Sequence, residues 1–136
     1  MASPKSSRQS VPSEASSSPG PAINIAVVAG TCSSPAEVRV LPSEQVLVQL
    51  QVSTRLESGT VSVPVAVLDP PAWVEALDSG DDVIVVGRVR RRFFRAAGAT
   101  ASRVEVEAAY VARPGDRRRG RAARRRVEAA LEPLEG

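Results

Sequence analysis

Residues Gly80 to Phe94 read GDDVIVVGRVRRRFF, and from Val83 onward they alternate in the manner of a β-strand. Successive side chains of a strand point to opposite faces, and neighbours on one face are about 6.6–6.8 Å apart. One face carries valines and Gly87. The other face carries two aliphatic residues and then a row of arginines that ends in a ring: Arg88, Arg90, Arg92 and Phe94. The pattern predicts a strand that is buried on both faces at one end and cationic on one face at the other.

This arginine row has two explanations. A basic track beside an aromatic ring suits a single strand of nucleic acid, because phosphates bind guanidinium groups and bases stack on rings. The alternative is a solvated edge strand whose charges discourage aggregation. The row by itself supports both explanations equally.

Charge is unevenly distributed along the 136 residues, whose net charge is +3. Residues 22–112 contain 8 Arg against 10 acidic residues, whereas residues 113–136 contain 8 Arg against 4. Five of the eight central arginines lie between Arg88 and Arg95, which indicates a local patch rather than a generally basic surface. The near-exclusive use of Arg over Lys favours phosphate binding, although a GC-rich genome would give the same bias.

The composition argues against an enzyme and against a metal or cofactor site. The chain has no His and a single Cys, Cys32, so a disulfide framework, a cysteine metal cluster and the commonest general base are all excluded. No apolar run approaches the roughly 20 residues that span a bilayer, and the first residues lack a signal-peptide core. We therefore expect a non-enzymatic, cytoplasmic protein without a cofactor or a membrane partner.

The chain divides into three segments. Residues 1–21, with eight Ser and four Pro, are predicted to be a disordered leader. Residues 113–136 are predicted to be an arginine-rich flexible tail with a weak helical pattern; basic tails often hold nucleic acid, although a purely solubilising tail is the alternative. Between them, alternating residues predict strands at 22–30 (continued at 37–41), 46–53, 60–67, 83–94 and 101–111, with a short helix after Pro70.

This order of elements predicts an all-β fold, a five-stranded antiparallel Greek-key barrel of the OB type with one short helix between its third and fourth strands. We expect Trp73 to plug the barrel end from the helix. Phe93 and Phe94 must face opposite ways on a regular strand, so Phe94 is the stacking candidate and Phe93 should cover the barrel end. In the last strand, alternation places Tyr110 on the face of Val106.

The chain resembles the bacterial single-stranded DNA-binding protein family over about residues 22–112. Residues 23–43, INIAVVAGTCSSPAEVRVLPS, share that family's order of an Asn, aliphatic residues, a Gly, a Pro and an Arg, here Asn24, Gly30, Pro35 and Arg39. The stretch GDDVIVVGRVRRRFF is similar to the family's fourth strand, in which a basic run precedes a base-stacking aromatic, here Phe94.

The resemblance implies an OB-fold that binds single-stranded DNA without sequence preference, supports DNA replication, repair and recombination, and assembles into homo-oligomers. RNA as the ligand, and a protein-interaction module that has lost nucleic-acid binding, remain as alternatives. Arginines at strand ends or outer faces would widen the track, although each alone is as expected for a solvated surface residue. The candidate nucleic-acid-binding residues are Arg88, Arg90, Arg92, Phe94, Arg95, Arg55, Arg103 and Arg39.

The sequence also departs from the family. Glu57 and Val61 stand where the family has further stacking aromatics, two hairpin loops are short, and the tail is rich in Arg where the family has an acidic tip. Each stacking contact is worth about 1–3 kcal/mol, so the loss of two or three would weaken binding by orders of magnitude. The resemblance is therefore to a divergent, actinobacterial-type paralogue in which charge substitutes for stacking.

Overall fold

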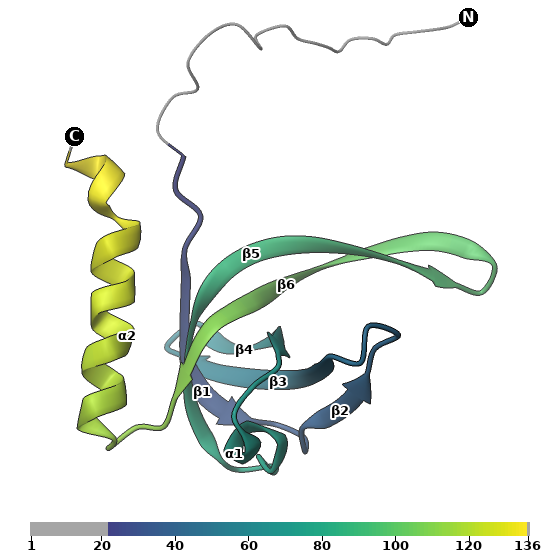
Figure 1. The fold of residues 1–136 in the computed structure, drawn as a ribbon, viewed down its shortest axis with the longest axis horizontal. Helices are drawn as coiled ribbons and strands as arrows, with labels where there is room; N and C mark the ends of the chain where they lie inside the picture. Colours follow the sequence, from purple (N-terminus) through teal and green to yellow (C-terminus); the bar gives the residue numbers. More distant parts are fainter. Residues whose placement is uncertain (1–21, 136) are drawn as a thin grey trace, which may run out of the picture.

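The structure is a computed structural model that describes residues 22–135, and a β-barrel forms its centre (Figure 1). The predicted leader, residues 1–21, lies outside the described residues. The strands are β1 (Ala26–Cys32), β2 (Glu37–Val40), β3 (Val46–Leu56), β4 (Gly59–Leu68), β5 (Asp82–Ala96) and β6 (Ala99–Ala112). The helices are α1 (Ala72–Glu75), α2 (Arg117–Ala130) and a short 3-10 helix, η3 (Glu132–Leu134).

The strands form one sheet in the order β1-β5-β6-β4-β3-β2, and an additional pairing between β1 and β3 closes it into a barrel. The predicted fold class is confirmed, with β1 and β2 as the two parts of the predicted first strand and α1 between the third and fourth strands. The sequence-based expectation of antiparallel pairing fails at one place. β4 and β6 run parallel where Val65 pairs with Val106, because the connection through α1 and β5 returns the chain to that edge in the same direction.

The core is filled from alternate positions of the strands, mostly by valines. Leu50, Val52 and Val85 are among the fully buried side chains, as is Cys32 near the end of β1. At the barrel end, Val74 of α1 and the following Leu77 are buried, whereas Trp73 is only partly buried and packs against the outside of the core. The expected apolar plug is therefore made chiefly by the two aliphatic residues, and the Trp73 ring instead lies under the guanidinium groups of Arg113 and Arg119.

A β-bulge interrupts the pairing of β5 with β6. Val86 pairs with Tyr110 but Gly87 pairs with Ala108, so β6 holds one extra residue at this point. Gly87 is required there, because a Cβ atom would overlap the carbonyl oxygen of Glu107. The bulge shifts the alternation by one residue, which turns Tyr110 away from the face of Val106 and corrects the sequence-based prediction. The guanidinium group of Arg126 of α2 instead lies over the Tyr110 ring, with its Cζ atom 5.0 Å from the ring centre.

From Arg88 to Glu107, β5 and β6 form a two-stranded hairpin, which we call the arm; its base still pairs with β4 and its outer part extends beyond the barrel (Figure 1). It turns at Ala97 and Gly98, both of which have positive φ angles, of 52° and 80°. Phe93 lies on the arm and 68% of its surface is exposed. The expectation that Phe93 covers the barrel end is therefore wrong, because the strand extends past the end of the barrel before it reaches this residue.

The arginine-rich segment differs from the predicted flexible tail, because residues 117–130 form α2 beside the roots of β5 and β6 (Figure 1). The Asp116 side chain caps the helix by accepting a hydrogen bond from the Arg119 amide at 3.1 Å. The guanidinium groups of Arg113 and Arg119 lie 4.8 and 5.5 Å from the centre of the Trp73 ring, which attaches the start of the helix to the barrel end. Within residues 22–135, no helix is both long and apolar enough to cross a membrane.

Candidate nucleic-acid interface

The predicted arginine row lies on one face of the arm. In the register of β5 and β6, Arg88 pairs with Glu107, Arg90 with Glu105, Arg92 with Arg103 and Phe94 with Ala101. Directly paired residues of neighbouring strands share a face, so Arg103 joins the row. We call this set the arginine face: Arg88, Arg90, Arg92, Phe94 and Arg103. Phe94 is 39% exposed and is not enclosed in the barrel.

Two carboxylates share this face with the arginines. Arg88 Nε donates to Glu107 Oε1 at 2.7 Å, and Arg90 Nη1 donates to Glu107 Oε2 at 2.6 Å. The hydrogen bond from Arg88, with that from Arg90, lowers the pKa of Glu107 below the ordinary carboxyl value against the opposing effect of partial burial. Arg92 Nη1 lies 3.7 Å from Oε1 of Glu105, a side chain that is only 4% exposed. The row is therefore partly neutralised from within.

The ion pairs leave the face able to bind phosphate. Its four arginines exceed its two carboxylates, and the side chains of Arg88 and Arg90 are 64% and 48% exposed. Exposed ion pairs of this kind contribute about 0.2–1 kcal/mol each. A phosphate that replaces Glu107 as the partner of these guanidinium groups would thus have to offset only this small free energy.

The arginine face looks onto two hollows on the outside of the barrel. One, of about 250 Å³, is lined by Arg90, Arg92 and the two carboxylates on one side. Its apolar lining comes from the opposite side: Leu41, Leu47, Ala66 and Leu68. The other, of about 190 Å³, places Arg103 opposite the side chains of Glu37, Gln49 and Gln51. Together they give the face cationic groups beside apolar and amide surface.

The remaining candidates lie apart from this set. Arg39 is exposed on β2 and pairs with Leu47, so it shares the outer face of the sheet at its edge. Arg55 is exposed near the β3–β4 turn, where it pairs with Thr60. Arg95 lies on the opposite face of the arm and donates to the carbonyl oxygen of Gly98 at 3.2 Å. The structure therefore brings together five of the eight predicted residues.

The opposite face of the arm holds a second basic and aromatic set, of which the sequence-based candidates included Arg95 alone. Phe93, the more exposed of the two rings, has Arg91 and Arg95 two positions to either side. Arg91 donates to the Ser102 hydroxyl at 3.1 Å, and neither arginine forms an ion pair within residues 22–135. The run RRRFFR carries the signal for this second set, because arginines stand at both odd and even positions and therefore lie on both faces of the strand.

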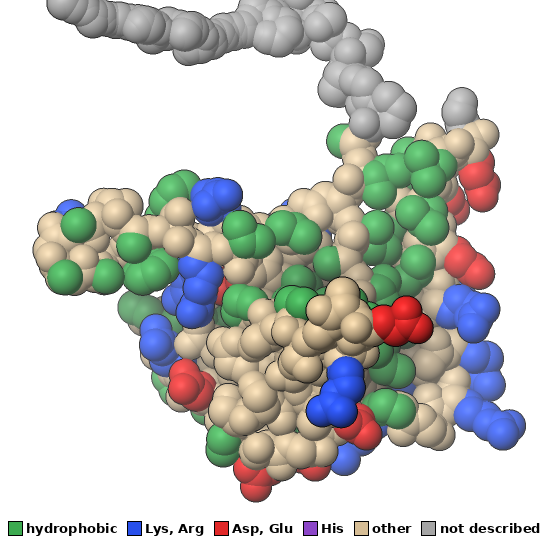
Figure 2. All heavy atoms as spheres, turned by 180° about the vertical axis from the view of Figure 1, so that it is seen from behind, with side chains coloured by type: hydrophobic (Ala, Val, Ile, Leu, Met, Phe, Trp, Pro, Cys, Tyr) green, Lys and Arg blue, Asp and Glu red, His purple; other side chains and the backbone are tan. Residues whose placement is uncertain are grey.

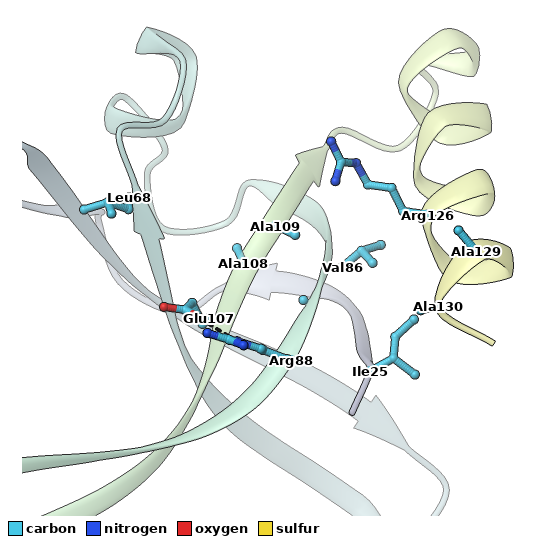
Figure 3. Close-up of a pocket in the computed structure, with 11 residues that line it drawn as sticks. Ile25, Leu68, Val86, Arg88, Glu107, Ala108, Ala109, Arg126, Ala129 and Ala130 are labelled. Carbon is cyan, nitrogen blue, oxygen red and sulfur yellow. Dashed lines mark hydrogen bonds and ion pairs between the residues drawn. The ribbon is translucent and has the colours of Figure 1, made fainter. Parts of the chain in front are cut away.

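A separate apolar hollow of about 570 Å³ lies between α2 and the outer face of β5 and β6 (Figure 3). Figure 3 shows the Arg88–Glu107 pair at its edge, with Ile25, Val86 and Ala130 among the other residues around it. In residues 22–135, no three His, Cys, Asp or Glu side chains are grouped so as to hold a metal ion. Burial raises the pKa of the Cys32 thiol, and the nearby Asp81 and Asp82 raise it further, which favours the protonated thiol over the thiolate.

Comparison with known proteins identifies the fold. No protein-family model and no curated protein sequence matches this chain. Among solved structures, the chain is similar to the wild-type single-stranded DNA binding protein from Thermus aquaticus, with 22% sequence identity and a TM-score of 0.57. The match covers 68% of this chain and 40% of the Thermus chain. The barrel of residues 26–112 is thus an OB-fold.

Proposed function

We propose that this protein binds single-stranded DNA without sequence preference, along the arginine face of the arm. The observation that carries the proposal is the placement of four arginines and an exposed ring on one face of a hairpin that projects from the barrel. Guanidinium groups bind phosphates and rings stack on bases of any kind, so neither contact depends on sequence. The likeness in fold to a single-stranded DNA binding protein supports the same proposal.

In this proposal the arginines and Phe94 have different roles. Arg88, Arg90 and Arg92 follow the phosphates in steps of about 6.6–6.8 Å, the spacing of alternate residues on a strand. Phe94 stacks on a base at the outer end of the row, and Glu107 gives up its two partners as phosphates arrive. With one ring on this face, charge supplies most of the affinity, so binding should depend strongly on salt.

The test is a titration with fluorescent oligo-dT at several salt concentrations. For single strands, the logarithm of affinity falls by about 0.7 per decade of salt for each phosphate neutralised. Arg90→Ala should lower that slope by about this amount, whereas Arg55→Ala, which removes an exposed arginine away from the face, should leave it unchanged. An equal slope in wild type and Arg90→Ala would exclude the arginine face as the binding site.

We further propose that the protein supports DNA replication, repair or recombination and assembles into homo-oligomers. In this proposal it is located in the cytoplasm close to bacterial DNA and is a divergent, actinobacterial-type paralogue of single-stranded DNA-binding proteins. RNA is a second candidate ligand, because OB-folds bind both nucleic acids. Competition between oligo-dT and oligo-U for the same protein separates them.

A further inference from the structure

The arginines of α2 separate into two groups. Arg119 and Arg126 turn toward the barrel, where they lie over the rings of Trp73 and Tyr110. The other five are exposed and, at about 100° per residue, fall within an arc of about 120°. We call them the α2 stripe: Arg117, Arg118, Arg121, Arg124 and Arg125. Figure 2 shows arginine side chains along the outer edge of the helix, with apolar side chains between the helix and the barrel.

The stripe holds five arginines, and one acidic residue, the exposed Glu128, lies on the same side of α2. Within residues 22–135, the ion pair that α2 forms joins Arg119 to Asp116 at 3.3 Å, and none involves a residue of the stripe. The arginine face of the arm differs in this respect, because Glu105 and Glu107 occupy its guanidinium groups. The α2 stripe is therefore the less neutralised of the two cationic surfaces.

The positions of these charges also oppose the helix dipole. The N-terminal end of a helix favours acidic side chains and the C-terminal end basic ones. In α2 the first turn has no acidic residue and starts with Arg117 and Arg118, and the last turn has no basic residue. This arrangement lowers the stability of the free helix, and such a departure from local preference is expected where the residues serve binding. A bound polyanion would reverse the effect.

The chemistry of the stripe selects the kind of partner. Among the described residues, the two rings beside α2 are Trp73 and Tyr110, and arginines lie over both. The stripe therefore offers charge without a surface for base stacking. It extends about 12 Å from Arg117 to Arg125. Over that length, duplex DNA presents about seven phosphate charges and a single strand about half as many.

We propose that the α2 stripe binds the phosphate backbone of duplex DNA. The arm adjoins α2, because Arg88 of the arm lines the same hollow as Arg126 and Ala130 on the inward side of the helix (Figure 3), and the stripe lies on the outer side of that helix. If the arm holds a single strand, as proposed above, the whole protein favours a junction between single-stranded and duplex DNA. The junction preference rests on the proposed function, whereas duplex binding by α2 does not.

The test compares three DNA probes by fluorescence anisotropy: oligo-dT, a blunt duplex, and the same duplex with a single-stranded overhang. The stripe variant is Arg121→Gln, Arg124→Gln and Arg125→Gln, since Gln keeps helix propensity while removing charge. The arm variant is Arg90→Gln with Arg92→Gln. In the stripe variant we expect the salt slope for the duplex to fall by about 0.9 per arginine removed, at least a tenfold loss of duplex affinity, and little change for oligo-dT.

The arm variant should show the reverse pattern, and wild type should prefer the junction over either separate probe by at least tenfold. Circular dichroism checks the helix; if the triple variant loses helical signal, the single Arg121→Gln variant should still lower the duplex slope by about 0.9. Unchanged duplex binding in the stripe variants, or a parallel loss for duplex and oligo-dT, overturns the proposal. Unchanged oligo-dT binding in the arm variant overturns the proposed function of the arm and leaves the α2 proposal standing.

Discussion

The substitution Glu107→Gln tests whether the Glu107 carboxylate lowers the affinity of the arginine face for phosphate. Glu107 is bound at once by Arg88 at 2.7 Å and by Arg90 at 2.6 Å. Gln keeps the size and planarity of the side chain but removes the charge. Both guanidinium groups then lose their internal counterion, and we expect oligo-dT to bind more tightly because phosphate no longer has to displace a carboxylate.

The size of the gain follows from the exposure of the two pairs. The side chains of Glu107 and Arg88 are 31% and 64% exposed, so solvent screens the interaction and each pair contributes about 0.2–1 kcal/mol. Two such pairs amount to about 0.4–2 kcal/mol, which corresponds to an increase in affinity of about two- to thirtyfold. Because Arg88 and Arg90 contact phosphate in the wild-type complex as well, the logarithmic salt slope should change by less than the value of about 0.7 that one added contact gives.

The assay is an anisotropy titration of labelled oligo-dT at four salt concentrations, with Glu75→Gln as the matched control. Glu75 is an exposed carboxylate on α1, away from the arm, so this control makes the same change in net charge. Glu107→Gln should exceed Glu75→Gln in affinity for oligo-dT at every salt concentration. Equal behaviour of the two variants, or weaker binding by Glu107→Gln, would refute the idea that phosphate and Glu107 compete for the same arginines.

Three further results are expected. Phe94→Ala should lower oligo-dT affinity by about 1–3 kcal/mol, whereas Phe93→Ala on the opposite face should change it much less; a larger effect of Phe93→Ala would reverse the assignment of faces. The pKa of Glu107 is lowered in the folded protein, so its ion pairs stabilise the fold above the unfolded pKa of about 4.3, and this stabilisation is lost as the pH falls through the folded pKa. The urea midpoints of wild type and Glu107→Gln should therefore converge in acid. A difference between the midpoints that does not depend on pH would contradict this. Gly87→Ala should destabilise the protein by about 1–3 kcal/mol, because the new methyl group overlaps the Glu107 carbonyl; thermal denaturation at an unchanged midpoint would show that the β-bulge tolerates a side chain.

The fold was largely predictable because alternation of valines with polar residues is a local signal. Val48, Leu50 and Val52 lie in the core as their spacing indicates, and the same alternation places Arg88, Arg90 and Arg92 on one face. Each of these inferences needs only the period of a strand.

What could not be predicted depends on the pairing of distant residues. The extra residue of the β-bulge reverses the direction of Tyr110, and the register of β5 with β6 brings Glu107 to Arg88, 19 residues earlier in the chain. The order of α2 has a similar origin, because its inward arginines gain the rings of Trp73 and Tyr110 as partners only when the barrel has formed. In the sequence alone, those arginines look like part of a solvated block of charge.

The most direct test of the central claim is an NMR titration of the arginine side-chain Nε–Hε signals with oligo-dT. Signals of Arg88, Arg90 and Arg92 should shift in proportion to saturation, with Arg88 showing the largest change as its 2.7 Å hydrogen bond to Glu107 gives way to phosphate. The signal of Arg55 should not move. Shifts confined to the arginines of α2, with those of the arm unchanged, would contradict the account.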